Sequence, residues 1–182
     1  MSRPAIFLDR DGVINVETGK HIVRAEDLAL IPGSVKAIAS LSGAGWPVVV
    51  YTNQSGVGRG LMTEDDLESI HAVIDREIAN HGGELTAVYS CTHHPDEGCS
   101  CRKPQPGMLL QAALDHDLDL AASYAVGDSP RDIAAAHAAG CVPVLVLSGS
   151  TRAYVPDMFP SAHPHQVFAD LATFAQWLLG TA

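Results

Sequence analysis

Two aspartates stand two residues apart at the end of the first apolar run of the chain. Asp9 and Asp11 follow the run Ala5–Leu8, and Gly12 comes next, where it permits a sharp turn that aims both carboxylates at one point. Two carboxylates alone would repel an anionic phosphate, so phosphate chemistry here requires a divalent cation, and Mg²⁺ prefers such hard oxygen ligands. The alternatives are a calcium-binding loop and a solvated acidic turn. An Asp-x-Asp pattern is common by chance at an arbitrary position but much less common directly after an apolar strand near the N-terminus. This placement favours phosphoryl transfer.

Polar residues also follow two later apolar runs. Thr52 closes the run Pro47–Tyr51, where its hydroxyl and the adjacent amides can bind phosphoryl oxygens, although turn chemistry alone is the alternative. Asp128 follows the run Ser123–Val126 within VGDSPRD. In YTNQSGVGRG, the residues expected to contact phosphate or substrate are Thr52, Asn53, Gln54, Ser55 and, for a second phosphate, Arg59.

Positive charge is scarce in this chain, which makes one Arg-Lys pair informative. The formal charge is −10, with 11 Lys and Arg against 21 Asp and Glu. An Arg-Lys pair is ordinarily a solvated surface, but Arg102 and Lys103 follow a cysteine cluster and precede a Pro-x-Pro-Gly turn. We expect Lys103 to neutralise a transferring phosphoryl group and Arg102 to hold another substrate anion by a bidentate contact. The acidity disfavours nucleic acid as a partner.

Three of the four cysteines lie within eleven residues, in CTHHPDEGCSC. In a cytosolic protein such clustering indicates a metal site rather than disulfides. Three thiolates and one imidazole complete a tetrahedral shell with no open position, as in structural Zn²⁺ sites. The predicted zinc ligands are Cys91, His93, Cys99 and Cys101, with His94 as a rival for His93.

The segments between these motifs predict an α/β fold. Short apolar runs at 5–8, 47–51, 87–90, 123–126 and 142–147 are typical of buried parallel strands. Start and stop signals predict helices that begin at Ser34 and Thr63 as N-caps, at Pro106, at Pro130 and at Val167, and end near Gly43–Gly45, His81, His116, Gly140 and Leu179. This alternation predicts a Rossmann-like three-layer sandwich with a mostly parallel central sheet, whose ligand site lies at the carboxyl ends of the strands. No insertion is long enough for a large cap domain.

Length and hydropathy limit the organisation of the chain. Residues 1–182 suit a single domain, since domains usually span roughly 100–200 residues. No apolar run reaches the roughly 18–20 residues of a membrane span, and the N-terminus does not resemble a secretory signal. We therefore expect a cytoplasmic protein with a small-molecule substrate, no membrane or nucleic-acid partner, and nothing that requires more than a monomer.

The segment DRDGVIN resembles the first motif of the haloacid dehalogenase superfamily in its phosphatase form. The resemblance implies that Asp9 is the nucleophile and that Asp11 protonates the leaving group and then activates water. It also implies a Mg²⁺ site formed by Asp9, Asp11 through its backbone carbonyl, and Asp128, with Asp132 supporting that shell. Dehalogenases of the superfamily lack the second aspartate, so its presence favours a phosphatase.

A zinc loop that runs into CRKP resembles the branch of histidinol-phosphate phosphatases and D-glycero-D-manno-heptose 1,7-bisphosphate 7-phosphatases. The segments TNQSGVGRG, HHP, RKPQPGM and AASYAVGD are similar to the heptose enzymes and extend the resemblance over nearly the whole chain. The resemblance implies removal of the C7 phosphate from a heptose 1,7-bisphosphate, for nucleotide-activated heptose and cell-envelope glycans. The alternatives are a histidinol-phosphate or broader sugar-phosphate phosphatase and, in another class, a non-catalytic zinc-stabilised binding domain.

Overall fold

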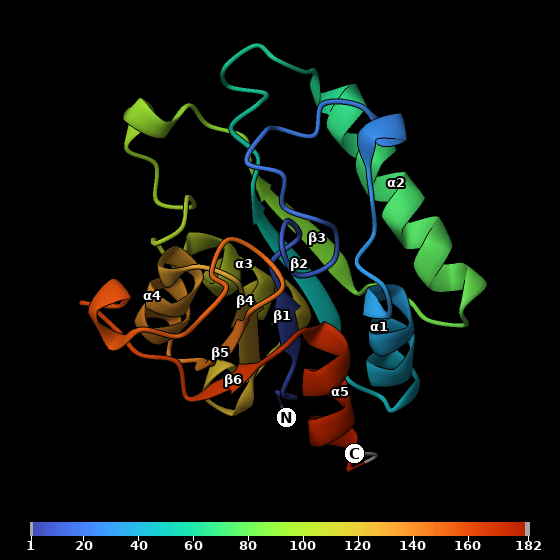
Figure 1. Ribbon diagram of the computed structural model, residues 1–182, viewed down its shortest axis with the longest axis vertical. Coiled ribbons are helices and arrows are strands. Elements are labelled where there is room, and N and C mark those ends of the chain that lie inside the picture. Colours follow the sequence, from blue (N-terminus) through green and yellow to red (C-terminus); the bar gives the residue numbers. More distant parts are fainter. Residues whose placement is uncertain (1, 181–182) are drawn as a thin grey trace.

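The computed structural model describes residues 2–180 and is organised around one six-stranded sheet (Figure 1). All the strand pairs are parallel, and the strand order is β3-β2-β1-β4-β5-β6. The strands are β1 (Ile6–Leu8), β2 (Val48–Asn53), β3 (Ala87–Cys91), β4 (Tyr124–Gly127), β5 (Val142–Val146) and β6 (Gln166–Phe168). The predicted parallel α/β architecture is confirmed.

Helices cover both faces of the sheet (Figure 1). The α-helices are α1 (Ser34–Gly43), α2 (Glu64–Asn80), α3 (Gly107–His116), α4 (Pro130–Ala139) and α5 (Leu171–Leu179). Short 3-10 turns occur at Ala25–Asp27, Pro95–Glu97, Leu120–Ala122 and Pro156–Met158. Helix α1 contacts both α2 and α5, whereas α3 contacts α4 on the other face. None of the described helices combines the length and apolar character needed to cross a membrane.

Alternation along the buried strands divides the core into two layers. Ile6 and Leu8 of β1 belong to the cluster that includes apolar side chains of α1, α2 and α5. Phe7, between them, belongs to the cluster that includes side chains of α3 and α4. Successive side chains of a strand point to opposite faces, so a strand covered on both sides is apolar at every position. This explains why short continuous apolar runs predicted the strands.

Two local predictions were wrong. Ser34 does not cap α1: Gly33 holds that position, in the left-handed region, and the Ser34 hydroxyl donates to the carbonyl of Ile14 at 2.8 Å. The final helix begins at Leu171 rather than at Val167, because Gln166–Phe168 pairs with β5 as an edge strand. Asp170 then caps α5 by accepting a hydrogen bond from the Thr173 amide at 2.8 Å. A three-residue strand is too short for its alternation to be distinguished from the adjoining helical pattern.

Candidate active site

The carboxyl ends of three neighbouring strands meet at one cavity. Asp9 follows β1, Thr52 and Asn53 end β2, and Asp128 follows β4. Because β1 lies between β2 and β4, these residues converge, and the Asp9 amide donates to the carbonyl of Val126 at 2.9 Å. The cavity at this edge has a volume of about 620 Å³, and the ten residues proposed from the sequence for catalysis, substrate and Mg²⁺ all line it.

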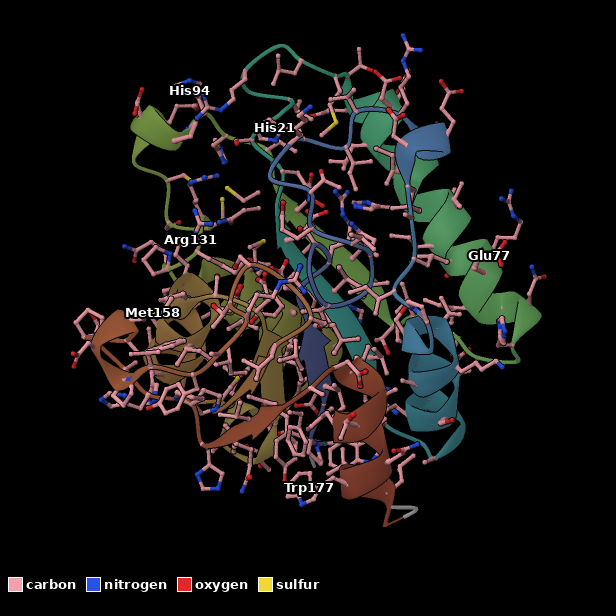
Figure 2. The ribbon with its side chains drawn as sticks, in the orientation of Figure 1. His21, Glu77, His94, Arg131, Met158 and Trp177 are labelled. Atoms are coloured by element: carbon pink, nitrogen blue, oxygen red, sulfur yellow. The ribbon has the colours of Figure 1, made fainter. Side chains whose placement is uncertain are left out.

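The cavity concentrates the few cations of an acidic chain. Six of its 11 Lys and Arg residues line it, namely Lys20, Arg59, Arg102, Lys103, Arg131 and Arg152. Only five of the 21 Asp and Glu residues do so. His21 lies on the loop after β1 and Arg131 at the start of α4, so different elements form the walls (Figure 2). Such a distribution attracts an anionic ligand despite the net charge of −10.

Three buried carboxylates meet at the bottom of the cavity. Oxygen atoms of Asp9, Asp128 and Asp132 lie within 4.8 Å of one another. The Lys103 ammonium lies 2.8 Å from Asp9 Oδ1 and 2.6 Å from Asp132 Oδ1. One ammonium leaves this cluster with excess negative charge, and its hard oxygen donors fit a divalent cation such as Mg²⁺.

The same crowding perturbs two of these acids. Burial, only partly opposed by Lys103 and reinforced by the neighbouring carboxylates, raises the pKa of Asp9 to about 8. Burial and the Asp132 charge raise the pKa of Asp128 to about 6. A buried carboxyl group resists ionisation unless a cation compensates it, so both groups favour a proton or a metal ion as partner.

Asp132 fixes Lys103 in this arrangement. It lies in the capping box of α4, where its Oδ2 accepts from the amide of Ser129 at 3.0 Å and from the Ser129 hydroxyl at 2.5 Å. Burial acts to lower the pKa of Lys103, but Asp132 and Asp9 outweigh it and raise that pKa above its ordinary value. Lys103 also donates to the carbonyl of Tyr51 at 3.2 Å, which directs its ammonium toward Asp9.

The Asp11 carboxylate lies outside this cluster of three acids. Its oxygens accept from Nε and Nη2 of Arg10 at 2.9–3.3 Å, from Asn15 at 2.9 Å and from Gln54 at 2.8 Å. Although burial acts to raise it, the Arg10 charge and these hydrogen bonds hold the pKa of Asp11 below its usual range. Neither Arg10 nor Asn15 was expected in the site from the sequence, although both flank the predicted aspartates.

The second motif divides between the ligand cavity and its support. Gln54 Nε2 donates at 2.8 Å both to Thr52 Oγ1 and to Asp11 Oδ2, and so links the end of β2 to the second aspartate. Asn53 exchanges hydrogen bonds with the backbone of Lys103, at 3.0 and 3.2 Å. Ser55 is buried at the cavity wall. The side-chain amides of Asn53 and Gln54 therefore form hydrogen bonds with other protein groups in the site.

Arg59, which is exposed, and Arg102, which is half-buried, also line the cavity, and we call these two residues its rim. The guanidinium nitrogen Nη1 of Arg102 is buried and has no hydrogen-bond partner. An unpaired buried donor is costly, so this nitrogen is available to an anionic ligand.

The cysteine cluster forms a compact donor set. Its three sulfur atoms lie 3.1–3.5 Å apart, and Nδ1 of His93 lies 3.2 and 3.6 Å from Cys101 and Cys91. Tetrahedral zinc with bonds of about 2.3 Å places sulfurs about 3.8 Å apart, so a slight expansion accommodates Zn²⁺. His94 instead accepts from the amide of Asp96 at 3.3 Å and lies outside the set. The geometry therefore favours His93 of the two candidate imidazoles.

This cluster is joined directly to the cavity wall. The amide of Gln54 donates to the Cys91 carbonyl at 2.8 Å, and the amide of Gly58 donates to Thr92 at 2.9 Å. A Cβ atom on Gly58 would lie 2.4 Å from the amide nitrogen of His94, so only glycine permits this approach. The cysteine loop thus holds the segment that carries Arg59 as well as Arg102 and Lys103.

The loop after β5 contacts Asp128. This contact was not predicted from the sequence. The amide of Ser150 donates to Asp128 Oδ2 at 2.5 Å, and the hydroxyl of Ser148 donates to the carbonyl of Gly12 at 2.7 Å. Cβ atoms on Gly12 or Gly149 would lie 2.4 or 2.1 Å from Asp128 Oδ2. The short SGS sequence was the only signal of this contact, and it carries no periodicity.

This chain is similar to known proteins over nearly its whole length. A family model described as HAD-hydrolase-like matches residues 100–174. A D-glycero-β-D-manno-heptose-1,7-bisphosphate 7-phosphatase of Pseudomonas aeruginosa is 44% identical, with 98% of this chain and 99% of the relative covered. A crystal structure of the D,D-heptose 1,7-bisphosphate phosphatase of Bordetella bronchiseptica, complexed with magnesium and phosphate, is similar with a TM-score of 0.91 and 43% identity, covering 98% and 99% of the two chains.

Proposed function

This chain belongs to the heptose 1,7-bisphosphate 7-phosphatase family of haloacid dehalogenase-like hydrolases, and we propose that it removes the C7 phosphate of D-glycero-β-D-manno-heptose 1,7-bisphosphate. The β anomer is proposed because the relatives from Pseudomonas aeruginosa and Bordetella bronchiseptica are named for it. The product would enter the synthesis of nucleotide-activated heptose for cell-envelope glycans.

In the proposed reaction, a carboxylate oxygen of Asp9 attacks phosphorus while the bond to the sugar oxygen breaks. The negative charge of the bound phosphate opposes the effect of Arg10 and raises the pKa of Asp11, so that Asp11 can carry a proton in the complex. Asp11 donates this proton to the sugar oxygen, then removes one from the water that hydrolyses the aspartyl-phosphate. Lys103 and Thr52 contact the equatorial phosphoryl oxygens. Mg²⁺, when bound by Asp9, Asp128 and the backbone carbonyl of Asp11, would neutralise charge on the phosphoryl group.

The observation that carries this proposal is the Lys103–Asp9 ion pair of 2.8 Å at the bottom of a cavity lined by six cations. The Lys103 ammonium beside the proposed nucleophile Asp9 can neutralise charge on the transferred phosphate. The guanidiniums of Arg59 and Arg102, farther out on the rim, suit a second phosphate such as that on C1 of a bisphosphate. A substrate with one phosphate, such as histidinol phosphate, would leave these rim cations without an anion.

We further propose Zn²⁺ on Cys91, His93, Cys99 and Cys101 as a structural ion. Its role would be to hold the rim, because the cysteine loop contacts Gln54 and Gly58 through its backbone. We propose that the protein acts as a cytoplasmic monomer without a nucleic-acid or membrane partner. Residues 1–182 would act as a single domain.

The decisive experiment measures phosphate release with Mg²⁺ for both anomers of the heptose bisphosphate, histidinol phosphate and fructose 1,6-bisphosphate. We expect kcat/KM for the β anomer to exceed the other values by at least about tenfold, because a misplaced phosphate loses its rim contacts. Asp9→Asn provides the control and should abolish turnover. A preference for histidinol phosphate or a flat profile would remove the heptose assignment while leaving the Asp9 chemistry in place.

A further inference from the structure

Arg10 lies between the two aspartates in the sequence and contacts both of them. Its side chain is only 1% exposed and is the largest of the fully buried side chains in the described residues. Its amide donates to Asp9 Oδ1 at 2.7 Å, while its guanidinium donates to both oxygens of Asp11 at 2.9–3.3 Å. A planar guanidinium that engages both oxygens restricts the carboxylate to one orientation.

His71 of α2 braces the other side of this guanidinium. Its Nε2 lies 3.5 Å from Arg10 Nη1. Arginine has donors only, so Nε2 must accept and the imidazole must be neutral. Burial and the adjacent Arg10 lower the pKa of His71 to about 4, which agrees with a neutral ring. His71 therefore contacts Nη1, the guanidinium nitrogen that does not bind Asp11, without a negative charge that would compete with Asp11.

We propose that Arg10, braced by His71, is a positioning residue that sets the orientation in which Asp11 delivers its proton to the leaving oxygen. This inference rests on the acid–base role proposed for Asp11. As the bond between Asp9 and phosphorus forms and the ester bond breaks, the proton passes from the Asp11 carboxyl group to the sugar oxygen. Arg10 is absent from the residues that line the cavity, so it acts through Asp11 rather than on the substrate.

Leaving groups of different basicity separate this role from a merely structural one. A sugar alkoxide is strongly basic and needs its proton in the transition state, whereas p-nitrophenolate is a weak base and does not. A misoriented Asp11 should therefore impair transfer from a sugar phosphate far more than transfer from p-nitrophenyl phosphate. The parameter kcat/KM is suitable because it excludes the later hydrolysis of the aspartyl-phosphate once leaving-group departure is irreversible.

The experiment compares Arg10→Met, Arg10→Lys and Asp11→Asn on both substrates. We expect Arg10→Met to lower kcat/KM for the heptose bisphosphate about 10²-fold and for p-nitrophenyl phosphate less than about tenfold, as befits loss of a proton donor. Arg10→Lys should restore only part of the loss, because an ammonium cannot engage both carboxylate oxygens in the same plane.

His71→Glu tests the same idea with Arg10 in place. The new carboxylate should draw the guanidinium away from Asp11 and produce the same selective loss, with a thermal unfolding midpoint close to that of the unsubstituted protein. His81→Glu, the same change at the exposed C-cap of α2, should leave both kcat/KM values unchanged. If Arg10→Met does not fold, the kcat/KM values of His71→Glu on the two substrates test the positioning role instead.

Equal losses on both substrates in folded Arg10→Met and in His71→Glu would overturn the positioning role. Asp11→Asn then identifies which proposal has failed. A selective loss in Asp11→Asn alone would reject only the role of Arg10. An equal loss on both substrates in Asp11→Asn would reject the acid–base role itself.

Discussion

Lys103 and Asp132 form a buried ion pair of 2.6 Å, in which each side chain is at most 3% exposed. Asp132 belongs to the capping box of α4, so one carboxylate links the start of a helix to the cation beside Asp9. The position of Lys103 is thus determined by the helix that follows β4 as well as by its own loop.

Replacing Asp132 with Asn should damage both stability and activity. Breaking this buried ion pair leaves the positive charge of Lys103 only partly neutralised in the protein interior. We therefore expect a loss of about 3 kcal/mol in the free energy of unfolding. Urea denaturation measures this loss, and steady-state kinetics should give a lower kcat/KM. Asp170→Asn is the matched control, because Asp170 caps α5 without an ion pair and Asn caps well. Similar losses in both variants would contradict a specific role for the ion pair.

Gly127→Ala should disturb the same cluster from the strand side. A Cβ atom at Gly127 would lie 2.1 Å from Cβ of Asp132, so the helix start must shift. We expect a lower unfolding midpoint and a fall in kcat/KM of at least about tenfold, since small displacements of reacting groups are costly. The control is Gly43→Ala at the end of α1, where a Cβ meets no atom within 4 Å and alanine favours the helix. An unaffected Gly127→Ala enzyme would show that Asp132 tolerates displacement.

Removal of the rim guanidinium should distinguish substrates by their number of phosphates. Arg102→Gln should raise KM for the heptose bisphosphate by at least about tenfold, as expected for loss of a charge-assisted contact. KM for p-nitrophenyl phosphate should hardly change. Arg24→Gln, at an exposed site outside the cavity, is the control. An equal rise in KM for both substrates would assign Arg102 to the transferred phosphate instead.

The zinc proposal predicts a difference between neighbouring histidines. His93→Asn should lower the zinc content measured by atomic absorption and lower the unfolding midpoint, because the shell loses one of its four ligands. His94→Asn should retain one zinc ion per chain. Cys101→Ser should behave like His93→Asn, whereas Cys141→Ala should keep its zinc, since Cys141 lies outside the cluster. Retained zinc in His93→Asn with loss in His94→Asn would reverse the ligand assignment.

Magnesium affinity should rise with pH between about 6 and 8. The pKa values of Asp9 and Asp128 in the metal-free protein, about 8 and about 6, keep a proton in the site that Mg²⁺ must displace. Fewer protons occupy these carboxyls as pH increases, so less free energy is spent on their release. Calorimetric titration in two buffers of different ionisation enthalpy measures the protons released. Binding without proton release and independent of pH would contradict the raised pKa values.

The raised pKa of Asp9 also affects stability in the absence of metal. The folded protein retains a proton on Asp9 up to a pKa of about 8, whereas an unfolded Asp releases it near its ordinary pKa of 3.8. The contribution of Asp9 to stability is therefore greatest below about pH 4 and falls as pH rises toward 8. Saturating Mg²⁺ should reverse this loss when unfolding midpoints are compared at pH 6 and pH 8.

Local patterns in the sequence predicted most of the elements and brought the candidate site residues to one edge of the sheet. Apolar runs predicted β1 to β5 because buried parallel strands are apolar on both faces, and strand ends located Asp9, Thr52 and Asp128 at one edge of the sheet. The spacing of Cys91, Cys99 and Cys101 also predicted a metal site. Ligands this close in sequence can come together within one loop.

Contacts between distant residues were decided only by the tertiary structure. His71 reaches Arg10 across 61 positions, and Ser150 reaches Asp128 across 22, because helix α2 and the loop after β5 pack beside the site. No local period relates such residues. The preference for His93 over His94 as the proposed ligand and the edge strand β6 likewise depend on how neighbouring segments approach one another, which the order of residues does not specify.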